Sequence, residues 1–229
     1  MNDSKIKIVE LYGLPGCGKS SLTKSLLLDL QKNCTTEIIK RSDISMVINK
    51  YWNRPLYLFF VLLVHLFKPS NIKLKILLLK YTISFPLNRY SIIYLLYMII
   101  VIDLYKNNNN KTIILDEGIV QFLSSIPHNI PIPIKEVNLV KRISKTIESM
   151  NINYLCVECQ LDREINVQRL KQRNRNDRFA YRKGLEDLLN TKESNLSLIA
   201  NEIAKNKLIV NMQNECSINS LIILKSIGY

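Results

Sequence analysis

The sequence is poor in glycine and cysteine, with six Gly and five Cys among 229 residues. So few glycines exclude a collagen-like chain, and so few cysteines exclude a small disulfide scaffold. An odd number of cysteines predicts reduced thiols, as in a cytoplasm. Cys156 and Cys159 form a CxxC pair, but they lie in an apolar run typical of a strand, where residues three apart face opposite sides. Since no second pair or nearby His completes a zinc set, we expect no metal role for them.

The sequence also lacks the features that send a chain into or across a membrane. The start, MNDSKIKIVELYG, has no basic segment followed by an apolar stretch, so no secretory signal is expected. The uncharged runs Pro55–Phe67 and Tyr90–Ile102 have 13 residues each, short of the roughly 18 to 20 that span a bilayer. We therefore predict a cytoplasmic protein. Contact with a membrane surface stays open, because lysines lie between the two runs.

Acidic residues are in the minority, with 19 Asp+Glu against 32 Lys+Arg and a formal net charge of +13. Residues 45–111 carry nine basic residues and one acid, and residues 163–183 carry eight basic residues and two acids. The rest of the chain is close to neutral. Two separate basic blocks predict anionic partners. From charge alone, nucleic acid, a phosphorylated small molecule and an acidic membrane surface are all candidates.

Short apolar runs alternate with segments of helical spacing. The runs predicted as buried strands are Ile6–Tyr12, Thr36–Ile39, Thr112–Leu115, Ile152–Val157 and Leu208–Val210. The predicted helices include Ser20–Leu30, Lys135–Met150 and Arg163–Arg173, the last with Asp162 as its N-cap. This alternation predicts an α/β fold with a parallel sheet covered by helices on both faces.

One domain is expected for residues 1–229, with a long apolar insert at 44–111 between the second and third strands. This interval holds about four helices' worth of sequence, and we predict mostly buried helices. His65 and His128 lie in apolar or proline-rich surroundings and are expected to be structural.

Residues 13–20 read Gly-Leu-Pro-Gly-Cys-Gly-Lys-Ser, a complete G-x-x-x-x-G-K-[ST] pattern. A predicted strand leads into it and a predicted helix leads out, which is the context that this motif requires. The glycines let backbone N–H groups converge on phosphate oxygens, and the start of the helix adds partial positive charge. We predict that ATP and Mg²⁺ bind here, through Gly13, Leu14, Pro15, Gly16, Cys17, Gly18, Lys19, Ser20 and Ser21. Lys19 is expected to reach the β- and γ-phosphates, and the Ser20 hydroxyl to ligate Mg²⁺.

With this loop and its flanking elements, the sequence resembles the P-loop kinases of small molecules, the group that contains thymidylate and nucleoside kinases. The resemblance implies a three-layer P-loop NTPase fold with a five-stranded parallel sheet and a helical insert in the position that binds the acceptor. Asp116 ends the third strand, where it can hold Mg²⁺ through water. Thymidylate-kinase-like proteins often carry Arg at the position of Glu117, where it contacts the substrate. The absence of this Arg here argues against a nucleoside-monophosphate acceptor. In a hydrolase, Glu117 would orient water.

The same resemblance implies an arginine-rich lid at residues 169–183. The matching residues are Arg169 and Arg173, with Arg175 and Arg178 in the lid itself. Guanidinium groups suit the charge of a transferring phosphoryl group, and a closed lid excludes water. We predict that Arg173, Arg175 and Arg178 stabilise the transition state. The alternative for this segment is a solvated basic helix face or a nucleic-acid patch. Asn211 follows the fifth strand, where such kinases pack the adenine.

A kinase also needs a group that orients or deprotonates the acceptor. Asp43 follows the second strand and is the candidate, although it can equally cap the next helix. Lys40 and Arg41 beside it can grip an acceptor phosphate or carboxylate. The apolar insert suggests an acceptor with an apolar portion, such as a lipid-linked sugar, or a subunit interface in a homodimer.

We therefore predict an ATP- and Mg²⁺-dependent kinase acting on a small-molecule acceptor, with an anionic acceptor favoured. The residues leave several acceptor classes open: a nucleoside, nucleotide, sugar, alditol or lipid-linked sugar. One alternative is a P-loop NTPase that uses hydrolysis for regulation or assembly, with Glu117 orienting water. Another is a nucleotide-gated module that binds a membrane surface or nucleic acid. Nucleic acid is the least favoured partner.

Overall fold

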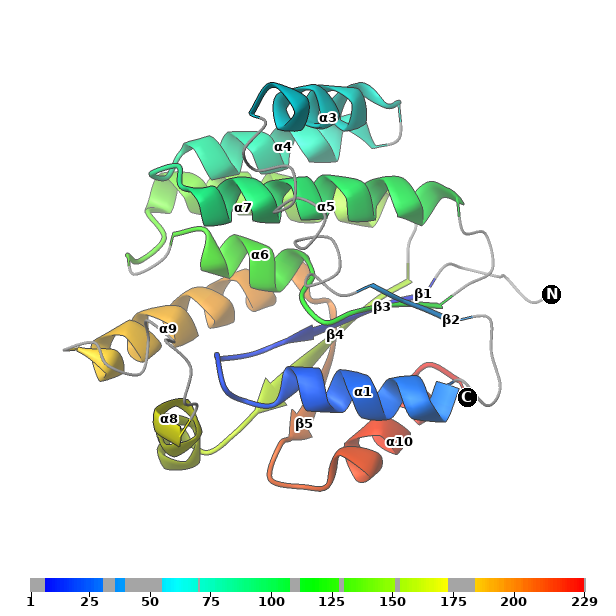
Figure 1. The fold of residues 1–229 in the computed structure, drawn as a ribbon, viewed down its shortest axis with the longest axis vertical. Coiled ribbons are helices and arrows are strands. Elements are labelled where there is room, and N and C mark those ends of the chain that lie inside the picture. The colour runs from blue at the N-terminus through cyan, green and yellow to red at the C-terminus, as the bar shows by residue number, and fades with distance from the viewer. Residues whose placement is uncertain are drawn as a thin grey trace.

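Figure 1 shows a computed structural model of the chain, which describes residues 7–30, 36–39, 55–69, 71–107, 112–127, 130–150, 153–172 and 184–228. The elements in chain order are β1 (Lys7–Tyr12), α1 (Lys19–Leu30), β2 (Thr36–Ile39), α3 (Pro55–Phe67), α4 (Ile72–Ile83), α5 (Arg89–Asn107), β3 (Thr112–Leu115), α6 (Ile119–Ser125), α7 (Ile134–Ser149), β4 (Asn153–Gln160), α8 (Arg163–Gln172), α9 (Leu185–Ile203), β5 (Asn206–Asn211) and α10 (Cys216–Ser226).

The strands of this described part form one parallel sheet of five in the order β2-β3-β1-β4-β5. The central strand β1 pairs with β3 from Lys7↔Thr112 onward and with β4 from Lys7↔Asn153 onward. Because all the strands are parallel, their carboxyl ends meet at one edge, where the loops after β1, β3, β4 and β5 converge. The predicted α/β fold with a parallel sheet flanked by helices is confirmed.

Helices cover both faces of the sheet. Figure 1 shows α1 and α10 on one face, and α6, α7 and the helices beyond them on the other. Successive strand residues point to opposite faces, so Val9 and Leu11 pack in the core beside α1 and α10, while Ile8 and Tyr12 join the larger core on the other face. Cys156 and Cys159 likewise belong to different cores, as their spacing predicted.

The predicted element boundaries differ from the observed ones mainly where strands end in polar residues. β4 continues to Gln160, three residues beyond the predicted end, and β5 covers Asn206–Asn211 rather than the three apolar residues in its middle. The backbones of β4 and β5 stay paired from Leu155↔Asn206 to Gln160↔Asn211, so pairing extends both strands beyond their apolar runs. The prediction that Leu208–Val210 is buried is wrong for Ile209, which is 54% exposed. Asp162 caps α8 as predicted, because its Oδ1 accepts hydrogen bonds from Glu164 N (2.9 Å) and Ile165 N (3.3 Å).

Between β2 and β3 along the chain lie α3, α4 and α5. α5 is the best buried of the three, since every residue from Tyr94 to Ile99 is buried. The prediction of buried helices is wrong for parts of α3 and α4, where five large apolar side chains are exposed: Val64, Phe67, Ile72, Ile76 and Ile83. None of the helices in the described ranges has the length and apolar content needed to cross a membrane.

A buried ion pair joins these three helices. Lys75 of α4 is fully buried and pairs with Asp103 of α5, and its Nζ donates a hydrogen bond to the His65 carbonyl of α3 at 2.7 Å. His65 Nδ1 lies 2.8 Å from Asp103 Oδ2. A buried charge is tolerated only when it is paired and hydrogen-bonded. His65 therefore has the structural role expected for it; His128 lies outside the described residues.

Candidate nucleotide-binding site

The loop after β1 has the tight conformation that its glycines permit. Gly16 has φ +89°, a backbone conformation that residues with a side chain rarely adopt. A Cβ atom at Gly13 would lie 2.7 Å from the carbonyl oxygen of Cys159 on the neighbouring strand β4. The first glycine thus allows β1 and β4 to stay in contact as the chain turns, and the second allows the loop to curl above the start of α1.

Lys19 begins α1 and folds back across this loop. Its Nζ donates hydrogen bonds to the carbonyls of Gly13 (2.8 Å) and Leu14 (3.3 Å) and lies 3.7 Å from Cys17 Sγ. Burial opposes the charged form, but the nearby Cys17 and Glu117 favour it, and the pKa of Lys19 is raised. The ammonium group is therefore held charged at the mouth of the loop.

Cys17 and Cys159 form a thiol pair beneath the loop. Both side chains are buried. A hydrogen bond from Cys159, with a further contribution from Lys19, lowers the pKa of Cys17 to about 6 despite burial. The pKa of Cys159 is raised, because it keeps the shared proton and is itself buried. The Cys17 thiol thus lies beside the Lys19 ammonium, and this neighbour and Cys159 both favour its deprotonated form.

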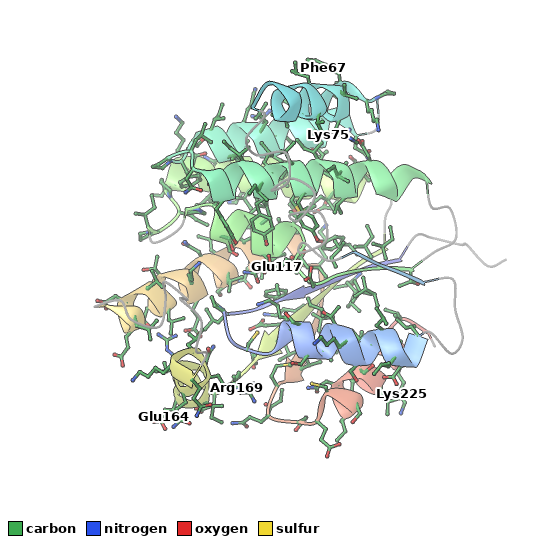
Figure 2. All side chains as sticks on the ribbon, in the orientation of Figure 1. Phe67, Lys75, Glu117, Glu164, Arg169 and Lys225 are labelled. Carbon is green, nitrogen blue, oxygen red and sulfur yellow. The ribbon has the colours of Figure 1, made fainter. Side chains whose placement is uncertain are left out.

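The two predicted carboxylates follow β3, the sheet neighbour of β1. The register pairs Glu10 with Leu115, so Asp116 and Glu117 emerge beside the last residues of β1. Glu117 is held from the helical layer: Tyr94 of α5 donates a hydrogen bond from its hydroxyl to Glu117 Oε2 at 2.6 Å, and Tyr97 donates to the Glu117 carbonyl at 2.7 Å. Figure 2 shows Glu117 at the boundary between the sheet and the helices above it. The end of β3 is thus linked to both the phosphate loop and the insert.

Glu10, in the middle of β1, holds the segment after β3 in place. Its carboxylate accepts hydrogen bonds from the backbone N–H groups of Gly118 (3.1 Å), Val120 (3.1 Å) and Gln121 (2.9 Å), and from the hydroxyl of Tyr154. Burial raises the pKa of Glu10, although these hydrogen bonds oppose the shift. Gln121 also contacts the phosphate loop, because its Oε1 accepts a hydrogen bond from Gly13 N at 3.1 Å. The phosphate loop is therefore tied to α6 through a buried polar network.

Lys192 of α9 is a second buried lysine near this end of the sheet. Its side chain is close enough to interact electrostatically with both Glu117 and Lys19. Burial, assisted by Lys19 and opposed by Glu117, lowers the pKa of Lys192 to about 8. Two lysines and one carboxylate, from α1, α9 and the end of β3, therefore gather beside the loop.

A cavity of about 530 Å³ opens on the α10 side of the loop. Its walls are the loop and start of α1, the end of α8, and the turn between β5 and α10; the lining residues are Gly16, Gly18, Ser21, Arg169, Gln172, Met212, Gln213, Asn214, Glu215 and Cys216. Asn211 shapes the turn, because its Oδ1 accepts a hydrogen bond from Gln213 N at 2.9 Å. Pockets for small ligands are typically of about this size. Arg169 lines this cavity, whereas Asn211 lines the neighbouring cavity of about 610 Å³; their contact with a nucleotide stays a prediction.

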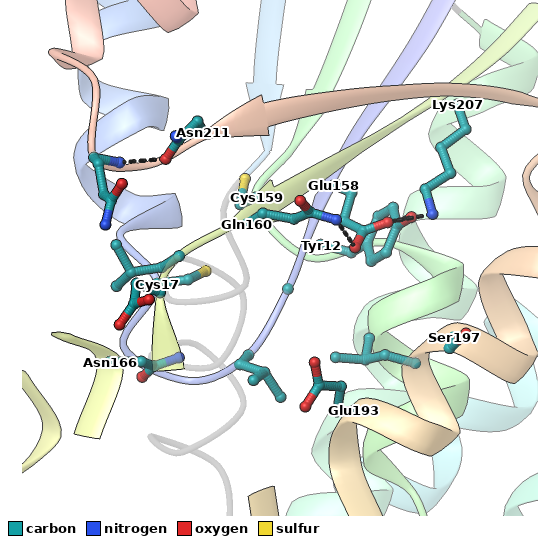
Figure 3. Close-up of a pocket in the computed structure, with 16 residues that line it drawn as sticks. Tyr12, Cys17, Glu158, Cys159, Gln160, Asn166, Glu193, Ser197, Lys207 and Asn211 are labelled. Atoms are coloured by element: carbon teal, nitrogen blue, oxygen red, sulfur yellow. Dashed lines mark hydrogen bonds and ion pairs between the residues drawn. The ribbon is translucent and has the colours of Figure 1, made fainter. Parts of the chain in front are cut away.

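A second cavity, of about 610 Å³, lies between the ends of β1, β4 and β5 and the helices α8 and α9 (Figure 3). Glu158 is its charged centre: it accepts hydrogen bonds from the Tyr12 hydroxyl (2.9 Å) and from Gln160 Nε2 (2.9 Å), and it pairs with Lys207. Asn166 also lines this cavity, with its side chain against Gly16, and among the described residues neither polar atom of its buried amide has a hydrogen-bond partner. Such a buried amide is a ready contact for a polar ligand at the loop.

The structure thus brings the loop residues, Asp116, Glu117, Arg169 and Asn211 to the same edge of the sheet. Asp43, Arg173, Arg175 and Arg178 lie outside the described residues, as do Lys40 and Arg41. Sequence reasoning missed Glu10, Gln121, Asn166 and Lys192. An acid inside the apolar strand KIVELY was a usable signal for Glu10; the other three lie on helices where a polar residue is ordinary, so nothing in the sequence distinguished them.

No protein-family model matches this chain, and no curated protein matches it. Solved structures do match over nearly the full length. The tunicamycin resistance protein of Deinococcus radiodurans is 10% identical, with a TM-score of 0.51 over 98% of this chain and 96% of that one. The deoxyadenosine kinase of M. mycoides with bound dCTP is 14% identical, with a TM-score of 0.51 over 96% of this chain and 98% of that one.

These likenesses establish the fold. The chain has the α/β architecture that deoxyadenosine kinase also has, and the phosphate-loop sequence lies after the central strand β1. The resemblance to small-molecule P-loop kinases that the sequence indicated is therefore confirmed at the level of the fold.

Proposed function

We propose that the protein is a kinase that transfers the γ-phosphoryl group of ATP to a small-molecule acceptor. The observation that carries the proposal is the position of Glu117. It interacts electrostatically with Lys19 of the phosphate loop and accepts a hydrogen bond from Tyr94 of the insert at 2.6 Å. A kinase needs this arrangement, because the transferred group must pass from a phosphate site to an acceptor site next to it.

The loop residues Gly13–Ser20 supply the phosphate site. Backbone N–H groups and the start of α1 face the phosphates, and Lys19 can turn from the loop carbonyls to the β- and γ-phosphate oxygens. Ser20 and Asp116 offer a hydroxyl and a carboxylate, oxygen donors of the kind that Mg²⁺ prefers. When bound, Mg²⁺ neutralises phosphate charge. Arg169 lines the cavity of about 530 Å³ beside the loop, which we propose for the purine end, and Arg173, Arg175 and Arg178 are proposed for the lid.

The acceptor is proposed to bind between the end of β3 and the insert. Tyr94 and Tyr97 orient the Glu117 segment from the helical layer, and Lys192 adds a positive charge beside it. An acceptor with an anionic group fits this charge, and Asp43 is the proposed base. A nucleoside, nucleotide, sugar, alditol or lipid-linked sugar all offer the hydroxyl or phosphate that the reaction needs.

The test is release of ADP from ATP and Mg²⁺ in the presence of panels of nucleosides, nucleotides, sugars and alditols. We expect one acceptor class to stimulate ADP release strongly over the rate without acceptor, and the phosphorylated product to be detected by mass spectrometry. ADP release that is equally fast with and without every acceptor would contradict the proposal.

The second candidate is a hydrolase, favoured by the electrostatic interaction of Glu117 with Lys19, which puts a carboxylate that can orient water beside the phosphate loop. Two variants separate the candidates. In a kinase, Asp43→Asn lowers transfer while the acceptor-independent rate stays slow. In a hydrolase, acceptor-independent turnover is fast and Glu117→Gln abolishes it, whereas Asp43→Asn has little effect.

A further inference from the structure

The outer surface of the helical layer carries exposed apolar side chains next to lysines. On α3 these are Val64 and Phe67, and on α4 they are Ile72, Ile76 and Ile83, with exposed fractions from 38% at Ile72 to 67% at Phe67. Lys68, Lys73 and Lys80 are exposed among them. We call this set of eight residues the α3–α4 face. This face is apolar with lysines among its apolar side chains. It lies at the opposite end of the molecule from α1 and α10 (Figure 1).

The arrangement on α4 is ordered. At about 100° per residue, Ile72, Ile76 and Ile83 fall within an arc of about 40°, and Lys80 and Lys73 follow along one side of it. The opposite side of the helix, with Leu74, Leu77, Leu78 and Tyr81, is buried against the protein. α4 therefore has a second apolar stripe that points to solvent, and its lysines lie where their long side chains can extend beside the stripe.

Carboxylates are missing from this region. Residues 44–102 contain seven Lys and Arg and neither Asp nor Glu. The first acid beyond them, Asp103, is buried and is engaged by Lys75 and His65, with Lys68 Nζ at 4.0 Å from its Oδ2. Lys73 and Lys80 have no acid on α4 itself, because its sequence contains none, and the face presents a positive field.

α3 contributes to this surface because it is uncharged and lies on the outside of the helical layer. Its sequence PLYLFFVLLVHLF has no formal charge, and it forms the outermost helix of the layer in Figure 1. Figure 2 shows Phe67 at the outer limit of the molecule, while Lys75 lies inward. A helix that is apolar all round is normally covered on every side, yet Val64 and Phe67 are exposed here.

We propose that the α3–α4 face docks on the surface of an anionic lipid bilayer. Apolar side chains can enter the boundary between headgroups and acyl chains while the lysines contact acidic headgroups. A second copy of the chain fits less well. In a symmetric dimer, Lys68, Lys73 and Lys80 of both copies would approach one another, and cores of protein interfaces are depleted of lysine. The inference goes beyond the proposed kinase and does not depend on it.

The test is flotation of the full-length protein, without nucleotide, with vesicles of phosphatidylcholine alone or of an equimolar mixture with phosphatidylglycerol. We expect binding to the anionic vesicles, weaker binding in high salt, and little binding to the neutral ones. Lys73→Glu/Lys80→Glu should weaken binding more than tenfold, since each lysine near an anionic surface contributes about fivefold. Phe67→Ser/Ile76→Ser should lower it by a similar factor, because less apolar surface is buried.

Matched controls lie on the other side of the molecule. Leu28 of α1 is 63% exposed, so Leu28→Ser removes a comparable apolar side chain; Lys24→Glu/Lys225→Glu matches the charge change at exposed lysines of α1 and α10. Leu28→Ser should leave vesicle binding near wild type, and Lys24→Glu/Lys225→Glu should weaken it less than the Lys73/Lys80 pair does. Melting temperatures and binding of a fluorescent ATP analogue report whether each variant is folded.

Three results would overturn the inference. The first is equal binding to neutral and anionic vesicles, or binding to neither. The second is undiminished binding of folded Phe67→Ser/Ile76→Ser, which would locate the contact elsewhere, as in the basic residues 163–183. The third is a dimer in sedimentation velocity that Phe67→Ser dissociates, with no vesicle binding, which would make the face an interface between copies of this chain.

Discussion

The phosphate-loop edge and the α3–α5 layer are both rich in lysine, but they hold it differently. At the loop, Lys19 rests on backbone carbonyls and Lys192 is buried near Glu117, so the positive charges converge on one small volume. In the layer, one lysine, Lys75, is fully buried against Asp103, and Lys73 and Lys80 point to solvent. The first arrangement suits a compact polyanion; the second combines an internal ion pair that joins helices with an exposed basic surface. Lysine side chains thus converge beside a loop in one region and join helices or face solvent in the other.

Of the variants that test this comparison, Asp103→Ala is expected to have the largest effect on the free energy of unfolding. Removing this carboxylate leaves Lys75 buried without its partner, and breaking a buried pair typically costs about 3–5 kcal/mol. Urea unfolding followed by circular dichroism measures the change in the free energy of unfolding. The control is Glu193→Ala, which breaks the exposed Arg163–Glu193 pair and should cost about 1 kcal/mol or less. Similar costs for the two variants would show that the Lys75–Asp103 pair does not join the layer.

At the other region the largest effect is expected on turnover rather than on folding. Lys19→Ala should lower kcat/KM for ATP by about 10²–10³-fold, the usual cost of removing one group that stabilises transition-state charge. Steady-state ADP release measures it. Lys24→Ala removes an exposed lysine five residues further along α1 and should change kcat/KM by less than about twofold. Near-wild-type turnover of Lys19→Ala would mean that the phosphates bind elsewhere.

The link between the two regions can be tested with Tyr94→Phe, which removes the hydroxyl donor to Glu117. Loss of a hydrogen bond to a charged group costs about 1.5–3 kcal/mol, so we expect kcat/KM for the acceptor to fall roughly tenfold or more. Tyr81→Phe is the control, because the Tyr81 hydroxyl donates to the Leu123 carbonyl at 2.8 Å. That change should lower stability and leave transfer unaffected. If both variants behave alike, Tyr94 only supports packing.

The smallest effect is a pH dependence assigned to Lys192. Its pKa is lowered to about 8, so the ammonium form is present below that pH and is lost as the pH rises through it. We expect kcat/KM for ATP, which reports the free enzyme, to decline severalfold across this range. Lys192→Met should remove the decline, while the exposed Lys205→Met should keep it. An unchanged profile in Lys192→Met would assign the titration to another group.

Much of the phosphate site was predictable because its determinants are local. The eight residues 13–20 are contiguous and have a required strand before them and helix after them, so spacing alone located the loop. Asp116 and Glu117 were found because two acids directly follow a short apolar strand, β3. What the sequence could not show was contact across the fold. Lys192 acquires its importance from its closeness to Glu117 and Lys19, which no periodicity reveals.

The insert was harder for the same reason. Its apolar runs predicted helices correctly, since α3 begins and ends with the run Pro55–Phe67. They did not show which helix sides are covered. Ile76 and Leu77 are adjacent and equally apolar, yet Ile76 is 40% exposed and Leu77 is buried. Only the positions of the neighbouring helices decide between them.

The central position of β1 also has a consequence for how the molecule is made. β1 is the first described strand, but it pairs with β3 about 105 residues later and with β4 about 146 residues later (Lys7↔Thr112 and Lys7↔Asn153). Contacts between such distant segments form late and slowly. During synthesis, β1 and the loop that follows it therefore have both neighbouring strands of the sheet only after β4 has left the ribosome.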